Sequence, residues 1–280
     1  RDARFDGLKF VLIFLVILGH MSFNSFGLPI HQAIYSFHMP LFVCISGYFS
    51  KHSPKFSIGR WVSNILGIYL IFETLHLLLN ILYLNKPFSI YNYIHPDLGL
   101  WYLLSLILWR VIAYAFHKLG IKPTWKMFGI SLILAIAIGF VPIGHTLSFQ
   151  RTFAFYPFFI LGQLVRKNEK IITLHTNYFF ELLFCATAIF VSCLLPRYMP
   201  IEPYILPSDA LLRIEQTIDA LILCICLLRL SRIHWPIHLS RLGQHTLYFY
   251  LYHTLFIRIQ ANILTHFHIN INIFHAFFLS

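Results

Sequence analysis

Apolar residues fill the chain in long, nearly uninterrupted runs, separated by short polar or proline-containing stretches. A helix needs about 20 apolar residues to cross the hydrocarbon layer of a membrane, and most of these runs approach that length. No alternating pattern typical of barrel strands occurs, and backbone inside a membrane must satisfy its own hydrogen bonds, so the runs predict helices. The predicted helices cover residues 5–23, 33–50, 61–84, 97–117, 127–143, 152–166, 176–195, 209–230 and 243–264, with a tenth apolar stretch at 268–280.

Composition indicates the same class of protein. Of the 280 residues, 58% are hydrophobic and 11% are charged, whereas a soluble globular domain carries about 25% charged residues. We therefore expect an all-α, polytopic transmembrane bundle of about ten helices, forming one domain over residues 1–280, because no fixed-period repeat or long linker occurs. The first apolar run lacks the cleavage site of a signal peptide. We expect a short leader before Arg1 and a tenth helix cut short by the chain end.

The distribution of basic residues predicts the orientation. With the N-terminus in the cytoplasm, sixteen of the 21 Lys and Arg residues fall on the inner side and five on the outer side, as the positive-inside rule requires. The net charge of +11 is thus a topology signal, and no nucleic-acid partner is expected. We expect a multi-pass protein of the inner membrane, whose basic face could attract lipid head groups or an anionic cofactor.

Ionisable side chains inside the expected helices are the first functional candidates, since each costs about 2.5–3.5 kcal/mol at mid-helix unless it is paired or hydrated. Lys9 and His20 are eleven residues apart, so they project from one helix face, roughly 16 Å apart along the axis. Lys9 lies near the inner end and His20 near the outer end. The structural alternatives are a snorkelling Lys9 or its ion pair with Asp6, and an interfacial role for His20.

The second expected helix brings His38 to a depth similar to that of His20. Pro40 removes a backbone hydrogen bond and loosens the helix nearby. For His38, both a structural and a functional role stay open. Ser46 and Gly47 favour close helix packing over chemistry.

Glu73 lies near the expected membrane midplane, with His76 one turn outward on the same face. This spacing is typical of di-metal carboxylate bundles, but these need a second such pair, and the sequence has none. We therefore expect no metal, and interpret the two residues as an ion pair or as a carboxylate that orients a histidine. The remaining candidates are Trp101 and Arg151 at the outer side, Trp101 where an aromatic belt would also place it, and His253 near mid-depth.

Several segments follow one another in the order of a known family. They are Phe5–Lys9 through Leu18–His20, Ser36–Phe42, Ser46–Phe49, Leu100–Leu103, Arg151–Phe153, Pro157–Phe159, and Leu242–Tyr248 through His253. Together they resemble the acyltransferase-3 family of integral membrane O-acyltransferases, in particular its fucose 4-O-acetylase-like and biofilm-polysaccharide branch. The family has a basic residue, ten others and then His in its first helix; Lys9 and His20 match this pattern, with Lys in place of the commoner Arg.

The resemblance implies transfer of an acetyl or succinyl group from cytosolic acyl-CoA to a hydroxyl of a surface or exopolysaccharide sugar. His20 would be the general base, a role worth about 10²–10⁴-fold in rate. The implied partners are membrane lipid, the carbohydrate acceptor, and polysaccharide synthase or export proteins. The catalytic candidates are His20, His38 and Glu73; the substrate-binding candidates are Lys9, Trp101, Arg151, His76 and His253.

Two other classes of function fit the buried charges. A transporter or flippase for an acylated or lipid-linked sugar shares midplane charges and broken helices, but it would leave acyl-CoA intact. A membrane scaffold or sensor would use the same groups only to fix helix packing, so substitution of His20 or His38 would lower stability and activity together.

Overall fold

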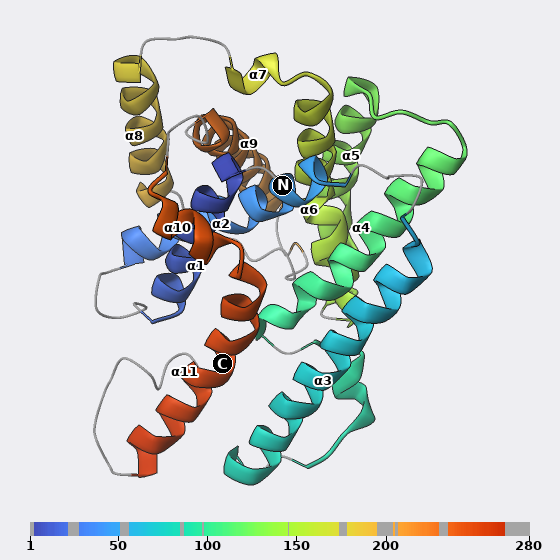
Figure 1. The fold of residues 1–280 in the computed structure, drawn as a ribbon, viewed down its shortest axis with the longest axis vertical. Helices are drawn as coiled ribbons and strands as arrows, with labels where there is room; N and C mark the ends of the chain where they lie inside the picture. The colour runs from blue at the N-terminus through green and yellow to red at the C-terminus, as the bar shows by residue number, and fades with distance from the viewer. Residues whose placement is uncertain are drawn as a thin grey trace. The chain divides into compact units, whose positions relative to one another are not determined.

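The computed structural model describes residues 3–21, 28–50, 56–84, 87–96, 98–144, 146–173, 178–194, 204, 207–229 and 235–266. Within these ranges every regular element is helical (Figure 1), which confirms the all-α prediction. Each predicted helix up to 243–264 has a counterpart, whereas the stretch 268–280 lies outside the described residues. The counterparts are α1 (Ala3–Met21), α2 (Leu28–Tyr48), α3 (Ile58–Leu84), α4 (Trp101–Lys118), α5 (Trp125–Ala137), α6 (Phe149–Lys167), α8 (Tyr178–Leu194), α9 (Pro207–Arg229) and α11 (Thr246–His266).

Shorter elements connect these helices and were not predicted. They are α7 (Lys170–Thr173), α10 (Ile237–Gly243) and the 3₁₀ turns η1 (Ile90–Tyr93), η2 (Leu98–Leu100), η3 (Ile138–Phe140) and η4 (Thr146–Ser148). With four residues in α7 and seven in α10, they are too short to leave a periodic pattern that sequence analysis can detect.

Helix length bears on the membrane prediction. Several helices have lengths near the roughly 20 residues that span a bilayer, from 18 in α4 to 27 in α3. By length and composition, one helix in the described part of the chain, Ile58–Leu82, is long and apolar enough to cross. Trp125–Phe140 and Phe179–Leu194 are apolar but shorter. The number of crossings and the orientation therefore stay predictions.

The chain divides into two compact units. The first contains Arg1–Met39, His175–Arg197 and Ile218–Ser280; the second contains Pro40–Leu174 and Tyr198–Thr217. One boundary falls inside α2 at Pro40, the residue whose missing N–H removes a helical hydrogen bond. The single domain predicted over 1–280 is not tested by this division, and each unit is described by itself.

In the first unit, α1 packs closely against α10 and also contacts α11 (Figure 1). Two glycines make the approach possible. A Cβ atom at Gly243 would collide with the backbone oxygen of Asp6, and one at Gly7 would collide with the Trp235 ring. The start of α1 and the end of α10 therefore meet with backbone atoms in contact, a geometry that only glycine allows.

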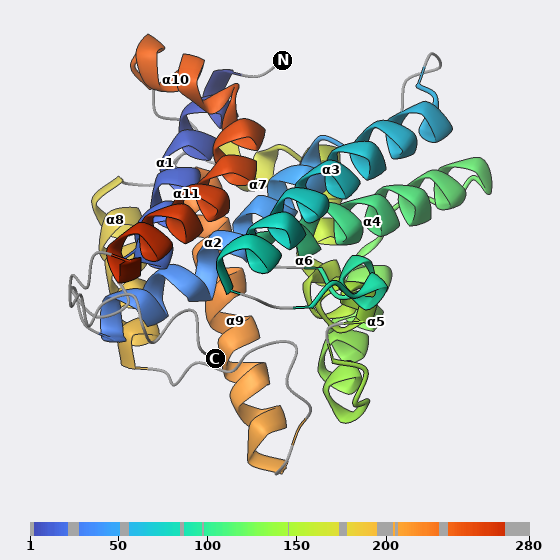
Figure 2. The ribbon, with the colours of Figure 1, turned by 90° about the horizontal axis from the view of Figure 1, so that it is seen from below.

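In the second unit, α3 and α4 run side by side (Figure 2), and α6 packs against α4 and α5. The fully buried Trp109 of α4 donates its indole N–H to the carbonyl of Thr152 in α6, at 2.9 Å. Gly47 and Gly162 allow α2 and α6 to touch: a Cβ on Gly47 would collide with the carbonyl of Phe159, and one on Gly162 with that of Cys44. This confirms the close-packing interpretation of Gly47.

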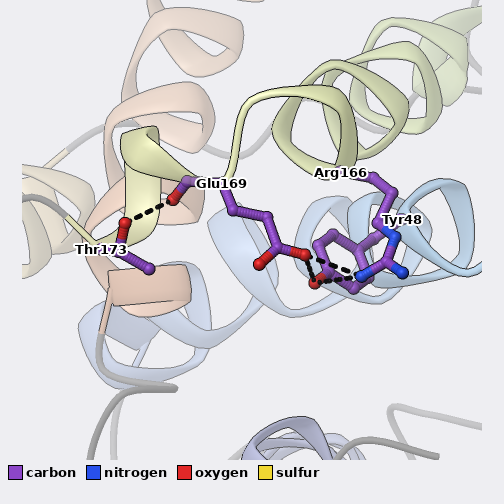
Figure 3. Close-up of polar contacts among 4 residues, drawn as sticks. All are labelled: Tyr48, Arg166, Glu169 and Thr173. Atoms are coloured by element: carbon purple, nitrogen blue, oxygen red, sulfur yellow. Dashed lines mark hydrogen bonds and ion pairs between the residues drawn. The ribbon is translucent and has the colours of Figure 1, made fainter.

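A polar cluster joins the ends of α2 and α6 to the residues around α7 (Figure 3). The Tyr48 hydroxyl donates to Glu169 Oε1 at 2.7 Å and accepts from Arg166 Nη1 at 2.9 Å. Arg166 also pairs with Glu169 at 2.7 Å, and its guanidinium lies 5.0 Å from the centre of the Tyr48 ring. The Thr173 hydroxyl donates to the Glu169 carbonyl at 3.0 Å. Tyr48 is thus the buried centre of this cluster.

Replacement of Tyr48 by phenylalanine is expected to lower the free energy of unfolding by about 1 kcal/mol, the size of one net hydrogen bond. The Arg166 and Glu169 side chains are 42% and 39% exposed, so their own ion pair contributes little. Thermal unfolding in detergent checks this against Tyr91→Phe, where the side chain is exposed. Equal unfolding temperatures for the two variants would contradict the prediction.

Candidate active site

The first unit brings three of the predicted histidines together around a tyrosine. His20 lies in the last turn of α1, Tyr35 and His38 lie on α2, and His253 lies on α11. The centres of the His20 and His253 rings are 5.3 Å apart, and those of Tyr35 and His38 are 4.7 Å apart. The Tyr35 hydroxyl lies 3.1 Å from Nδ1 of His20. We call these four residues the histidine cluster.

A small residue makes the contact between α1 and α2 possible at this point. A Cβ atom at Gly19 would lie 3.2 Å from Cε2 of Tyr35 and 3.3 Å from Cγ2 of Ile34, closer than ordinary van der Waals contact. Because Gly19 has no side chain, the Tyr35 ring can approach α1 closely enough to contact His20, the residue that follows Gly19.

Backbone carbonyls determine which ring nitrogen of two histidines carries the proton. Nδ1 of His38 lies 2.7 Å from the carbonyl of Ile34, and Nδ1 of His253 lies 2.7 Å from that of Tyr250. A carbonyl can only accept, so Nδ1 is the protonated nitrogen in each neutral ring and Nε2 keeps its lone pair. Nε2 of His253 has no hydrogen-bond partner in the described part of the protein. The His253 ring is thus set to accept a proton at Nε2.

His20 is more exposed than the other two histidines of the cluster. His38 and His253 are 3% and 5% exposed, whereas His20 is partly exposed. A group that takes a proton from a substrate must touch the substrate. Of the three histidines, His20 is therefore the one that a ligand can reach.

Lys9 forms an ion pair with Asp6, its neighbour one turn earlier on α1, at 2.7 Å. This is the local pairing that the sequence left open as a structural alternative. The Asp6 side chain is 7% exposed, in line with its position beside Gly243. Since α1 is continuous from Lys9 to His20, the axial separation of roughly 16 Å between them holds.

The second unit brings Trp101 and Arg151 together at the starts of α4 and α6. The guanidinium carbon of Arg151 lies 5.1 Å from the Trp101 ring centre, and Phe155 stacks on the same indole at 5.4 Å. Trp101 is 7% exposed, so it is a packed residue here and not an outward-facing belt residue. A cation over an indole is stabilised by the negative face of the ring. This contact therefore holds the Arg151 guanidinium beside Trp101.

A strained turn leads into this pair. Leu147 and Ser148 have φ of 47° and 57°, a left-handed conformation that residues other than glycine rarely adopt. The backbone N–H of Leu147 donates to the carbonyl of Ile94 at 2.7 Å, which ties the turn to the segment after η1. Strain of this kind persists only where the surrounding structure enforces it, and it clusters at functional sites. Here it determines where α6 starts, and thus where Arg151 lies.

Glu73 and His76 lie on α3 in the second unit, and both side chains are almost completely buried. Among the described residues, no group of three or more His, Cys, Asp and Glu side chains comes close enough to hold a metal ion. The structure therefore assigns no ligand set to this pair, and the expectation that the protein uses no metal stays a prediction.

Tyr35 and His31 were not among the residues predicted from the sequence. With His38 they occupy positions spaced by four and three residues, which lie on one helix face, and the His31 and Tyr35 rings are 4.2 Å apart. That spacing was a usable signal. The importance of Tyr35, however, comes from its contact with His20, which lies on a different helix.

Curated proteins similar to part of this chain include two nodulation proteins. The chain is 29% identical over 183 residues to nodulation protein NolL of Sinorhizobium fredii (strain NBRC 101917 / NGR234) and 34% identical over 188 residues to nodulation protein NolL of Mesorhizobium japonicum (strain LMG 29417 / CECT 9101 / MAFF 303099). Each match covers 59% of this chain and 48% of the relative. The chain thus spans about half the length of these curated relatives. No solved structure matches it.

The family comparison covers far more of the sequence. Residues 2–280 match the family described as an acyltransferase domain. The match includes both units and every residue of the histidine cluster. As the order of its motifs predicts, the chain belongs to the acyltransferase-3 family.

Proposed function

We propose that this chain is the catalytic part of an integral membrane O-acyltransferase. It would move an acetyl or succinyl group from cytosolic acyl-CoA to a hydroxyl of a surface or exopolysaccharide sugar. Family membership supports acyl transfer. The observation that carries the proposal is the histidine cluster, in which a partly exposed His20 contacts Tyr35 and lies beside the buried imidazole of His253.

A sugar hydroxyl is a weak nucleophile, so the reaction needs a base near the attacking oxygen. His20 takes the hydroxyl proton as the oxygen attacks the thioester carbonyl, and a tetrahedral oxyanion forms. Collapse breaks the carbon–sulfur bond, and the leaving thiolate receives the proton from the His20 imidazolium. His20 is preferred to His38 and His253 as the base because it is the accessible one. Positioned general bases contribute about 10²–10⁴-fold.

Other candidates would stabilise the oxyanion or bind the substrates. Within the histidine cluster, His38 is the candidate for stabilising the oxyanion. In the second unit, Arg151, whose guanidinium lies over the Trp101 ring, is a further candidate for the oxyanion or for an acyl carboxylate. Glu73 and His76 are both buried on α3, and we propose that the carboxylate orients the imidazole. Each of these assignments rests on residue type and local geometry within its own unit.

The donor would reach His20 along α1. The CoA nucleotide carries several negative charges and would dock against the basic loops expected on the cytoplasmic side. Its pantetheine arm would then cover the roughly 16 Å from Lys9 to His20. The nucleotide would stay in the cytosol while the thioester enters the protein.

Exposed apolar side chains support placement in the membrane. They cover much of α3 and α8, where a soluble protein would present polar residues. Contiguous exposed apolar side chains of this kind are typical of surfaces that contact lipid or another protein. We propose lipid as that partner, in a multi-pass inner-membrane protein with a cytoplasmic N-terminus. The exposed residues are Leu66, Leu70, Ile71, Leu75, Leu78 and Leu82 on α3, and Phe179, Phe180, Leu182, Leu183, Phe184, Phe190, Val191 and Leu194 on α8.

The test is acyl transfer by the purified protein in detergent, with labelled acetyl-CoA and succinyl-CoA. An enzyme transfers or hydrolyses the labelled acyl group, whereas a transporter leaves it intact. Mass spectrometry of surface glycans from cells with and without the gene then identifies the acceptor. Intact acyl-CoA together with unchanged glycans would refute the proposal.

Replacement of Arg151 by glutamine is expected to lower kcat by about 10²-fold with both donors, the loss typical of a missing oxyanion-stabilising group. Arg151→Lys keeps the charge but loses the guanidinium that lies over the Trp101 ring, so an intermediate rate is expected. Steady-state kinetics with acetyl-CoA and succinyl-CoA checks this. A loss confined to succinyl-CoA would instead place Arg151 at the acyl carboxylate, and unchanged rates would exclude both roles.

A further inference from the structure

We propose that Tyr35 is a positioning residue that selects the base-competent form of His20. The inference rests on the proposed function, because it concerns how the base of that reaction is prepared. Tyr35 belongs to none of the candidates that the sequence singles out. Its hydroxyl lies 3.1 Å from Nδ1 of His20. In a neutral imidazole, a proton on Nδ1 leaves the lone pair on Nε2.

The geometry makes Tyr35 the centre of the histidine cluster. Its hydroxyl contacts Nδ1 of His20, and its ring lies 4.2 Å from the centre of His31 and 4.7 Å from the centre of His38. The two α2 histidines flank the phenol ring, while Gly19 leaves room for it on α1. The ring is therefore held by packing, and its hydroxyl points at one defined atom.

The contact differs in kind from those of the other two histidines. Backbone carbonyls face Nδ1 of His38 and His253, and a carbonyl permits only one tautomer. A hydroxyl can donate or accept. If Tyr35 donates to Nδ1 of His20, Nε2 carries the proton and cannot act as a base. If Tyr35 accepts from Nδ1–H, the Nε2 lone pair is free for the sugar hydroxyl.

Acyl transfer therefore requires the second arrangement, in which the Tyr35 oxygen accepts. When the sugar proton arrives at Nε2, the imidazolium has N–H groups at both nitrogens, and the Tyr35 oxygen already accepts the one at Nδ1. A hydrogen bond to a charged donor is stronger than one to a neutral donor. Tyr35 would thus hold the correct tautomer before the reaction and stabilise the charge that develops during it.

The test compares Tyr35→Phe with wild type and with Tyr248→Phe, whose side chain is exposed on α11. Phenylalanine keeps the ring contacts and removes only the hydroxyl. We expect kcat to fall about tenfold, the effect of one hydrogen bond. The KM for acyl-CoA should match that of wild type, and the unfolding temperature should fall by no more than that of Tyr48→Phe, which also loses partly buried hydroxyl contacts. Tyr248→Phe should leave all three quantities unchanged.

A second readout does not depend on activity. Nitrogen-15 NMR distinguishes the two neutral tautomers, and the His20 signals are identified by their loss in His20→Gln. We expect a protonated Nδ1 in wild type and a mixture of tautomers in Tyr35→Phe. Full kcat in Tyr35→Phe, or a wild-type His20 protonated at Nε2, would overturn the inference. If wild type transfers no acyl group, the proposed function fails, and the tautomer measurement still decides the contact itself.

Discussion

His20→Ala is expected to lower acyl transfer by about 10²–10⁴-fold, because it removes the group that takes the proton from the attacking hydroxyl. His20 lies in the last turn of α1 and is partly exposed, so its loss should not unfold the chain. The measurement is the rate of transfer from labelled acetyl-CoA by purified protein, together with O-acylation of surface glycans in cells.

The control for this substitution is His238→Ala, which removes an exposed imidazole on α10 and should leave the rate unchanged. Full O-acylation by a folded, abundant His20→Ala protein would show that another group is the base. His38→Ala then becomes informative, since His38 belongs to the same cluster and its Nδ1 faces a backbone carbonyl, which makes Nε2 its basic nitrogen. A parallel loss of stability and activity in both variants would favour the scaffold interpretation.

Gly162→Ala is expected to cost about 3 kcal/mol of stability, at the upper end of the penalties for overpacking. The added Cβ would collide with the carbonyl of Cys44 and come within 2.7 Å of the Tyr48 amide nitrogen. These are backbone atoms on another helix, so relief requires α2 and α6 to move apart. Unfolding of the purified protein by heat or denaturant in detergent measures the loss.

Gly129→Ala is the matched control. Gly129 is also helical, but a Cβ built there meets nothing within 4 Å, so the substitution should be neutral or stabilising by about 0.5–1 kcal/mol. The difference between the two variants isolates the contact between α2 and α6 from the general effect of glycine in a helix. If both variants had the same unfolding midpoint, this close approach would not exist in solution.

The helices themselves were readable from sequence. The predicted runs 61–84 and 209–230 differ from α3 and α9 by at most three residues at either end, because a long apolar run needs no partner to identify it. Short elements differ: α7 and α10 depend on contacts with neighbours and left no signal of their own.

The candidate site shows the same division. Local spacing along α1 was sufficient to place Lys9 and His20 on one face and to suggest the pair between Lys9 and Asp6. The spacing on α2 could place Tyr35, one of 15 tyrosines, on one face with His31 and His38. It could not place Tyr35 beside His20, because that contact joins two different helices. Likewise, nothing in the sequence showed that Leu147 and Ser148 would adopt left-handed backbone before Arg151.

The sequence by itself determined the helical class, the positions of the long helices and the family, since these follow from apolar run length and from the order of short motifs. Tertiary structure alone decided which imidazole nitrogens hold lone pairs, which glycines lie between touching backbones, and that Trp101 supports Arg151. The reason is physical. Hydrophobicity acts residue by residue along the chain, whereas hydrogen-bond direction and van der Waals contact depend on atoms that folding brings together from distant segments.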